Sequence, residues 1–488
     1  MISVLLLTPL VLAALMPGLR RRVMWQCRLV FAYAVGLAAA AVWFAVTGPE
    51  PGPASLLAVD DLSIWFLLIM AVVLVATTLY SCDFFRRPEE QETAERAWKY
   101  HVFLLLFVAS MLGVLLSAHL GLLWVFVETS TLSSAMLVCY HPGRNSYEAA
   151  WKYIFICSIG ISFAFIGIIF LSLSAAGLEH SSLSWDWLDS HAAQLNPFWL
   201  KTAMPLLLIG LGTKMGLAPM HNWLPDAHSE APAPISATLS AALLNASCLG
   251  ILRVHMILLR AGLGEYSRTI LIVMGFLSLL VPAIFILRAR NYKRMLAYSS
   301  VENMGIIAIG IGFGGAALFG ALLHLAGHSL VKASFFLTSG NLYSIYHSKR
   351  IRDVHGIWRC DAMSAWLWLG GAVGICAFPP FVTFISEFNI MARMLQERAI
   401  VALLLFGLLL TVILGAMFKH VLGMVFGRPG FECGTDIDIS DNASLLGPAA
   451  YLPQLVLLLA AVGLGLCLPD PVYHLMTKAV TFIGEQGL

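Results

Sequence analysis

The chain has 488 residues, of which 59% are hydrophobic and only 11% carry a charge. This composition exposes too much apolar surface for a soluble fold, and it predicts an all-α polytopic membrane protein. The net charge of +2 and the lack of a Walker motif give no reason to expect a nucleic acid or nucleotide partner. The apolar N-terminus has no basic leader region, so we expect a retained first span rather than a cleaved signal.

Apolar segments follow one another along the chain, and we expect about fourteen transmembrane helices. They lie near residues 2–18, 24–47, 61–84, 101–118, 121–140, 150–175, 202–226, 235–260, 267–288, 296–313, 316–345, 364–393, 400–425 and 449–467. Lysine and arginine gather in the connections after the odd-numbered spans, for example Arg20 to Arg22 and Arg288 to Arg294. Because basic residues accumulate in cytoplasmic loops, both termini are expected on the outer side of the membrane.

Six ionisable side chains lie inside these apolar segments. A charge at that depth costs about 3 kcal/mol on insertion scales, so such residues usually mark an ion or proton path. The six are Glu128, Lys214, His324, His328, Lys332 and Glu387. Three of them recur every four residues in ALLHLAGHSLVKASFF, which places them on one helical stripe with about 6 Å of rise between neighbours. This spacing predicts a proton relay.

Two expected spans contain prolines that would interrupt a helix. The seventh span holds Pro219 and Pro225, and the twelfth holds Pro379 and Pro380. Proline removes a backbone donor, so the freed carbonyls must meet water or polar groups in a cavity. The second break follows the first by five spans, an odd repeat length that predicts two inverted five-helix repeats. The expected units are N-terminal helices at 1–100, a first repeat at 101–260, a second, inverted repeat at 261–428, and a C-terminal loop and helix at 429–488.

The nine cysteines form no CxxC pair and no Cys/His cluster at ligand spacing. Neither a disulfide framework nor an iron-sulfur or zinc site is therefore predicted. We expect no cofactor and no metal in this chain, and any redox chemistry to reside elsewhere.

Four stretches of the sequence resemble a known family. They are the stretch from Lys214 to Pro234, the segment KRMLAYSSVENMG, the HxxxHxxxK helix and FPPFVTFISEF. Together they resemble the antiporter-like, proton-translocating membrane subunits of respiratory complex I, membrane-bound hydrogenases and Mrp-type cation/proton antiporters. Within that group, LPDAHSEAPAPIS and YSSVENMG are most similar to the F-type subunit of hydrogenase-4 and formate hydrogenlyase-like complexes.

The resemblance implies residue roles. Glu128 matches a fifth-span glutamate and Lys214 a seventh-span lysine, while His324, His328 and Lys332 match an eleventh-span relay and Glu387 an acidic twelfth-span site. A carboxylate that approaches a buried lysine favours its charged form, so movement of Glu128 would make Lys214 hold or release a proton.

The resemblance also implies partners and a location. The expected partners are the lipid bilayer, other membrane subunits of one complex and, through them, peripheral iron-sulfur or hydrogenase subunits. Iron-sulfur clusters and a nickel-iron centre would lie in those partner subunits. The implied location is the cytoplasmic (inner) membrane of a bacterium or archaeon.

One departure from the family affects the link between the two halves. Where relatives often place an eighth-span lysine or histidine, this chain has LSAALLNASCLG, so Asn245 or Ser240 occupies those positions. Neither side chain titrates. The link must then run through water held by Asn245, Ser240 or Ser247, or the coupling is weaker than in relatives.

Further polar residues have two interpretations. Asp226, His228 and Glu230 are expected where the seventh span meets the cytoplasm, either lining a proton access route or capping helices. Arg253 and His255 lie near the outer end of the eighth span, and their long or amphipathic side chains favour snorkelling to the interface.

Three functions remain open on the sequence alone. The first is an ion-translocating subunit of a redox complex such as a hydrogenase or a relative of NADH:quinone oxidoreductase, with no redox site of its own. The second is an Mrp-type sodium(cation)/proton antiporter subunit. The third is a structural membrane subunit that does not conduct, which Asn245 favours and the costly buried charges disfavour.

Overall fold

A computed structural model describes residues 1–51, 56–87, 90, 96–427 and 446–484, and it is almost entirely helical. The N-terminal elements are α1 (Ile2–Leu15), η1 (Met16–Leu19), α2 (Val23–Thr47), the two-residue strands β1 (Glu50–Pro51) and β2 (Ala58–Val59), and α3 (Asp61–Phe84). Next come α5 (Ala97–Leu116), α6 (Leu120–Val138), α7 (Arg144–Ser174), α8 (Trp185–Ser190), η4 (Ala192–Gln194), α9 (Pro197–Met215), α10 (Trp223–Glu230), α11 (Ala233–Thr238), the π-helical turn η5 (Leu239–Leu243) and α12 (Leu244–Arg260). The rest comprises α13 (Gly264–Phe285), η6 (Ile286–Arg288), α14 (Tyr292–Phe313), α15 (Ala316–Tyr346), η7 (Ile351–Asp353), α16 (Ile357–Cys360), α17 (Ala362–Ile375), α18 (Val382–Gln396), α19 (Ile400–Phe426), η8 (Pro448–Ala450), α21 (Leu452–Leu466) and α22 (Asp470–Ile483).

The prediction of an all-α polytopic membrane protein is confirmed. Among the described residues, eleven helices are long and apolar enough to cross a membrane, or twelve if α21 and α22, bent by 78°, form one span. Of the fourteen expected segments, those near 202–226 and 364–393 are absent from this count because each is divided into two shorter helices. The beginning of the expected C-terminal loop, at 429–445, lies outside the described residues.

The structure confirms both proline breaks. Helix α9 ends at Met215, Gly216 follows in the left-handed region at φ 85°, and α10 begins only after Pro219. Helix α17 ends at Ile375, and α18 begins after Pro380. The carbonyls freed by each break find side-chain donors. Trp223 Nε1 lies 2.8 Å from the Thr213 carbonyl, and Thr383 Oγ1 lies 2.6 Å from the Gly374 carbonyl.

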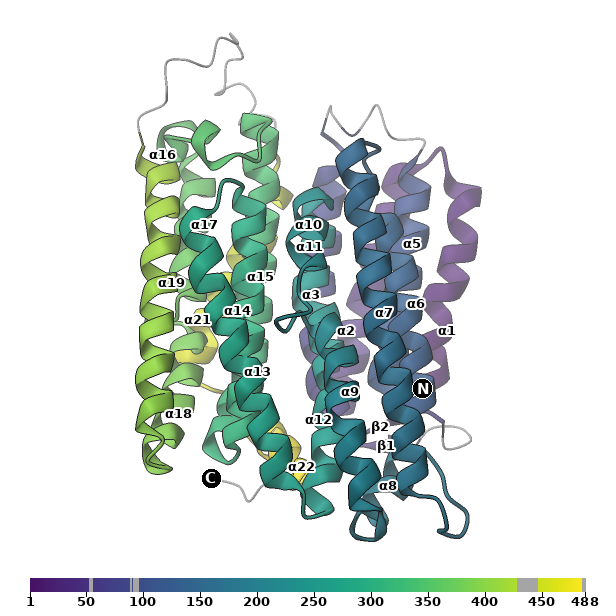
Figure 1. Ribbon diagram of the computed structural model, residues 1–488. Coiled ribbons are helices and arrows are strands. Elements are labelled where there is room, and N and C mark those ends of the chain that lie inside the picture. Colours follow the sequence, from purple (N-terminus) through teal and green to yellow (C-terminus); the bar gives the residue numbers. More distant parts are fainter. Residues whose placement is uncertain (52–55, 88–89, 91–95, 428–445, 485–488) are drawn as a thin grey trace.

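Helix α15 lies at the centre of the second half of the molecule. It contacts α14, α17, α18 and α21 as well as α3 and α11 from the N-terminal part of the chain. Figure 1 shows this green helix standing behind α14, with α19 at the outer edge. Because α15 is surrounded on all sides, the polar residues on it are removed from both lipid and water.

Close backbone packing joins α7 to α9. A Cβ atom at Gly160 would collide with the Thr213 side chain, and one at Gly210 would collide with Ala164. Glycine at both positions lets the two helices approach more closely than larger residues would allow. This contact brings the polar side chains of α7 against the end of α9, where Lys214 lies.

Candidate functional site

Lys214 lies in the last turn of α9, directly before the first break, and its side chain is fully buried. Its Nζ donates to the Tyr153 hydroxyl at 2.9 Å and lies 4.8 Å from the centre of the Tyr153 ring. The same hydroxyl lies 2.7 Å from Ser134 Oγ. Lys214 therefore begins a chain of hydroxyl groups that runs from α9 through α7 to α6.

Glu128 is half-buried on α6, and Lys214 is not its partner. Its Oε1 accepts a hydrogen bond from Ser158 on α7 at 2.8 Å, while its buried Oε2 has no hydrogen-bond partner. Among the described residues, no ion pair within 4.0 Å joins Glu128 to Lys214. Glu128 and Lys214 instead contact α7 at two places, Ser158 and Tyr153.

The three residues of the predicted stripe, His324, His328 and Lys332, lie on α15 with no exposed surface. His324 has a partner at each ring nitrogen: Ser386 Oγ at 2.8 Å from Nδ1 and Asn303 Oδ1 at 2.9 Å from Nε2. Both ring nitrogens of His328 are buried without a hydrogen-bond partner in the described part of the chain. Lys332 Nζ donates to the Leu296 carbonyl of α14 at 2.7 Å.

Two carboxylates lie near this stripe. Glu387, on α18 next to Ser386, is only 7% exposed, and Glu302, on α14, is 5% exposed. Glu302 lies within Coulombic range of both Lys332 and Glu387. Glu302 is not among the six pathway residues predicted from the sequence, although YSSVENMG places it one position before Asn303.

The region between the halves is polar and contains the π-helical turn η5. The Asn245 amide donates to Ser329 Oγ of α15 at 2.7 Å and to the Ala241 carbonyl at 2.8 Å, and its Oδ1 is buried without a partner. Ser240 Oγ lies 2.9 Å from Ser300 Oγ of α14. Ser247 instead bonds to the Leu243 carbonyl of its own helix. Asn245 and Ser240 thus reach the second half of the molecule, whereas Ser247 does not.

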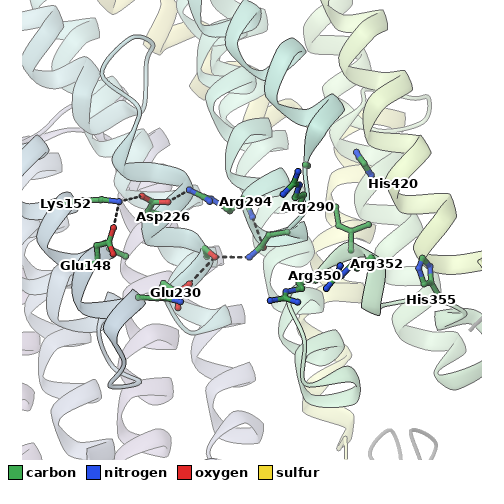
Figure 2. Close-up of a pocket in the computed structure, with 16 residues that line it drawn as sticks. Glu148, Lys152, Asp226, Glu230, Arg290, Arg294, Arg350, Arg352, His355 and His420 are labelled. Atoms are coloured by element: carbon green, nitrogen blue, oxygen red, sulfur yellow. Dashed lines mark hydrogen bonds and ion pairs between the residues drawn. The ribbon is translucent and has the colours of Figure 1, made fainter. Parts of the chain in front are cut away.

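The residues Asp226, His228 and Glu230 do not lie together. Asp226 and Glu230 are four residues apart on α10 and share one face, which lines a cleft of about 990 Å³ (Figure 2). His228 falls on the opposite face, fully buried and stacked on Phe336 with ring centres 4.7 Å apart. Both of its ring nitrogens lack a partner. Phe336 lies one helical turn from Lys332 on α15, so His228 is near the buried stripe, and the cytoplasmic position expected for the three residues stays a prediction.

The expectation of snorkelling is wrong for Arg253. This residue is 3% exposed, and its guanidinium pairs with Asp60 at 2.7 Å and donates to Ser63 Oγ at 2.9 Å. A buried arginine needs such an acceptor, and here it comes from the start of α3. His255 is also buried, with Nδ1 2.7 Å from Ser267 Oγ. Nothing in the eighth-span sequence indicates either distant partner.

Lys293 is a further buried cation, and it is not among the residues predicted from the sequence. Its Nζ donates to the Ala231 carbonyl at 2.7 Å, where α10 ends. It lines a second cavity of about 290 Å³ together with Glu230 and Lys349. Its position in KRMLAYSSVENMG, at the start of a span, resembles that of an ordinary interfacial lysine, which explains why the pattern gave no signal.

The described residues contain no group of three or more His, Cys, Asp or Glu side chains arranged to hold a metal ion. The buried polar side chains described above are lysine, histidine, carboxylate, amide and hydroxyl groups. Such a series of lysine, histidine, carboxylate and hydroxyl groups can pass protons when water bridges the longer gaps.

Comparison with known proteins identifies relatives of this architecture. Residues 117–414 match the family model described as NADH:quinone oxidoreductase/Mrp antiporter, transmembrane. The Hydrogenase-4 component F homolog of Methylacidiphilum infernorum (isolate V4) is 35% identical over 383 residues, which cover 77% of this chain and 80% of that relative.

Solved structures share the fold over nearly the whole chain. A chain of the membrane-bound sulfane sulfur reductase, an archaeal respiratory membrane complex, matches with a TM-score of 0.83 at 22% identity, covering 99% of this chain and 98% of that one. A chain of the Mrp complex from Dietzia sp. DQ12-45-1b matches with a TM-score of 0.82 at 20% identity, covering 99% of each. At such identities the two matches show a common fold, and both solved chains come from multisubunit membrane complexes.

Proposed function

The chain belongs to the NADH:quinone oxidoreductase/Mrp antiporter family of membrane subunits, and we propose that it translocates protons in a redox-driven complex of the hydrogenase-4 or formate hydrogenlyase type. The observation that carries the proposal is the line of fully buried titratable side chains, Lys214, His324, His328 and Lys332, completed by Glu387. A structural scaffold gains nothing from cations placed at such cost in a membrane interior.

In this proposal Glu128 and Lys214 form the controlling end of the path. Ser158 and Tyr153 lie on the same helix, α7, and hold Glu128 and Lys214 respectively. A shift of α6 relative to α7 would change the distance between the carboxylate and the ammonium group, and thus the free energy of the charged lysine. Redox chemistry in partner subunits would drive that shift.

The hydrogen bonds of His324 supply a second element that depends on protonation. Asn303 donates its amide to the Ser299 carbonyl at 2.6 Å, so its Oδ1 is free to accept from His324 Nε2. Ser386 has one hydroxyl proton and two possible acceptors, His324 Nδ1 and the Thr383 carbonyl. Neutral His324 accepts that proton at Nδ1, whereas charged His324 donates to Ser386, which then donates to Thr383. Protonation of His324 thus changes the direction in which the Ser386 hydroxyl donates its proton, and Ser386 directly precedes Glu387 in the sequence.

Ordered water is expected between these groups. The unpartnered nitrogens of His328 and His228 and the unpartnered oxygen of Asn245 are all buried, and a buried polar atom without a partner costs about 1–3 kcal/mol. Water at these three positions would satisfy the atoms and join the Asn245–Ser329 bridge to the α15 stripe. In this scheme the non-titrating Asn245 holds the water and does not itself carry the proton.

The finer architecture is part of the proposal. We count fourteen spans by adding the broken pairs α9–α10 and α17–α18 and the bent pair α21–α22 to the eleven long helices. We assign inverted repeats to α5–α12 (101–260) and α13–α19 (261–428), after three N-terminal helices at 1–100. The two longest helices support this division. Helices α7 and α15 each have 31 residues, and each is followed by a short helix and then by a broken span.

The assignment to a hydrogenase-type complex rests on the relative named Hydrogenase-4 component F homolog. The proposed partners are membrane subunits and, through them, peripheral subunits that hold iron-sulfur clusters and a nickel-iron centre, while this chain holds no cofactor. We place it in the cytoplasmic membrane of a bacterium or archaeon, with both termini outside. Figure 1 supports a common side for the termini, since the N-terminus and α22 lie toward the same end of the bundle.

Purification of the full chain in mild detergent from its native membrane, with mass spectrometry of the co-purifying proteins, tests the complex. We expect hydrogenase or dehydrogenase subunits and iron-sulfur proteins to co-purify with the chain. We also expect proteoliposomes that contain the complex to take up protons when its substrate is oxidised. A set of small antiporter subunits without iron-sulfur proteins, together with sodium-dependent proton exchange, would reassign the chain to an Mrp-type antiporter. An assembled redox complex that moves no ions through this chain would make it a structural subunit.

A further inference from the structure

The cleft beside α10 has one side on which all charges are already paired. Asp226 pairs with Arg294 and with Lys152, and Lys152 also contacts Glu148 at 2.6 Å. Glu230 pairs with Lys349 at 3.2 Å. The three carboxylates that line the cleft are therefore engaged, and Figure 2 shows the dashed lines that join Glu148 and Asp226 to Lys152 and Asp226 to Arg294.

The opposite side of the cleft carries arginines without such partners. Arg290 and Arg350 both line it, and neither has a carboxylate within 4.0 Å among the described residues. Arg352, next to them in Figure 2, pairs with the adjacent Asp353 at 3.4 Å. This group of Arg290, Arg350 and Arg352 is called the arginine wall below.

Backbone hydrogen bonds hold the arginine wall in place. The connection before α14 pairs with the connection after α15: Ile351 N donates to the Arg290 carbonyl at 3.0 Å, and Tyr292 N donates to the Lys349 carbonyl at 3.2 Å. Asn291 and Arg350 form an antiparallel bridge between these bonds. Like charges held side by side repel, so the site gains stability when an anion enters it.

The chemistry of the wall selects a phosphate group. Guanidinium groups match phosphate oxygens with paired hydrogen bonds, and a wall of several arginines can contact one phosphate from different directions. The cleft of about 990 Å³ has room for a larger molecule than a bare phosphate ion.

Exposed apolar side chains lie close in the sequence to residues that line the cleft. Phe285 and Leu287, which directly precede the arginine wall, are 50% and 49% exposed, and Tyr147 and Trp151 on α7 are 57% and 67% exposed. A phosphate ion has no apolar group that could cover these side chains, whereas the glycerol and acyl groups of a phospholipid would cover them. The cleft lies at the ends of membrane-spanning helices, where lipid headgroups reside.

We propose that this cleft binds the headgroup of an anionic phospholipid, with Arg290 and Arg350 as the principal phosphate ligands. The acyl chains then lie along the apolar residues of α7 and α13. The bound lipid would bridge the two halves of the molecule at one membrane surface. This inference does not depend on proton translocation.

The test compares lipid binding by three forms of the full chain, purified in mild detergent and delipidated. They are the wild type, the double variant Arg290→Gln/Arg350→Gln, and the matched control Arg20→Gln/Arg21→Gln, which removes two exposed arginines from the connection between α1 and α2. Native mass spectrometry measures the Kd for phosphatidylglycerol, phosphatidylcholine and inorganic phosphate. The double variant is expected to bind phosphatidylglycerol at least about tenfold more weakly than the control, because it loses two charge-assisted contacts.

Each alternative result has a defined meaning. Equal phosphatidylglycerol affinity in the double variant and the control would overturn the site, and so would equal affinity of the wild type for phosphatidylcholine. Inorganic phosphate that displaces phosphatidylglycerol at equal concentration would assign the cleft to free phosphate and overturn the lipid. If the double variant does not fold, the single variants Arg290→Gln and Arg350→Gln replace it, with an expected loss of about threefold or more each.

Discussion

Helices α7 and α15 have the same length and occupy matching places before the two broken spans, yet they differ in their surroundings. In the most apolar stretch of α15, 94% of the residues are buried, against 39% in α7. The enclosed helix carries His324, His328 and Lys332, whereas the open helix contributes only the hydroxyls of Tyr153 and Ser158. Titratable groups are thus concentrated where lipid cannot reach, and the open helix holds its charged neighbours through neutral groups.

This difference suggests a division of labour. The first half, with Glu128 half-buried at its edge, is placed to respond to a neighbouring subunit. The second half is placed to pass protons through an enclosed path. Four substitutions test this division.

The largest effect is expected for Lys332→Ala in the enclosed half. Loss of the only ammonium group of the α15 stripe removes a proton carrier, and proton uptake by proteoliposomes should fall about a hundredfold while assembly remains nearly normal. Lys419→Ala, at an exposed position on α19, is the control and should keep the wild-type rate. Unchanged uptake in Lys332→Ala would remove the stripe from the mechanism.

A smaller loss is expected for Glu128→Gln in the open half. The amide keeps a hydrogen bond to Ser158 but loses the charge that acts on Lys214, so uptake should fall about tenfold. Glu179→Gln, in an exposed loop, provides the comparison. A greater loss than in Lys332→Ala would reverse the proposed division between the halves.

The connection between the halves is tested by Asn245→Ala. This change removes the bonds to Ser329 and Ala241, and it should lower the free energy of unfolding by about 1–3 kcal/mol and proton uptake about fivefold. Thermal unfolding and proteoliposome assays on the same preparation measure both quantities. Ser247→Ala is the control, because Ser247 bonds only within its own helix. If both variants transport equally well, Asn245 is not on the route.

The smallest effect is expected for Ser158→Ala. The Glu128 carboxylate loses one donor but keeps its charge, and we expect uptake to change by no more than about threefold. A loss as large as that of Glu128→Gln would show that the Ser158 contact, rather than the charge, determines the response of the open half.

The helical spacing and the prolines made the main features of the site predictable. The four-residue repeat in HxxxHxxxK correctly placed three residues on one buried face, because that repeat follows the geometry of the α-helix itself. Pro219 and Pro380 correctly marked the breaks, since a missing backbone donor has a local effect.

Contacts between distant segments could not be predicted in this way. Arg253 finds Asp60, nearly two hundred residues earlier, and Cys27 Sγ lies 3.7 Å from His101 Nε2 although the cysteine spacing showed no such cluster. The burial of His228 could not be predicted, because the sequence of α10 does not reveal which face of so short a helix packs inward. Glu302 could not be predicted as a pathway residue for a related reason. Its role depends on its proximity to Lys332, which lies on another helix.

The π-helical turn at Leu239–Leu243 accommodates one extra residue in the connection between the halves. Such a turn holds one residue more than a regular helix over the same stretch. Deleting one residue within the turn would let an ordinary helix fill that stretch, and Asn245 would still face Ser329. In a regular helix the same deletion would rotate every side chain beyond it by about 100°. The turn is therefore the part of this connection that can lose a residue and still keep the contact between the two halves.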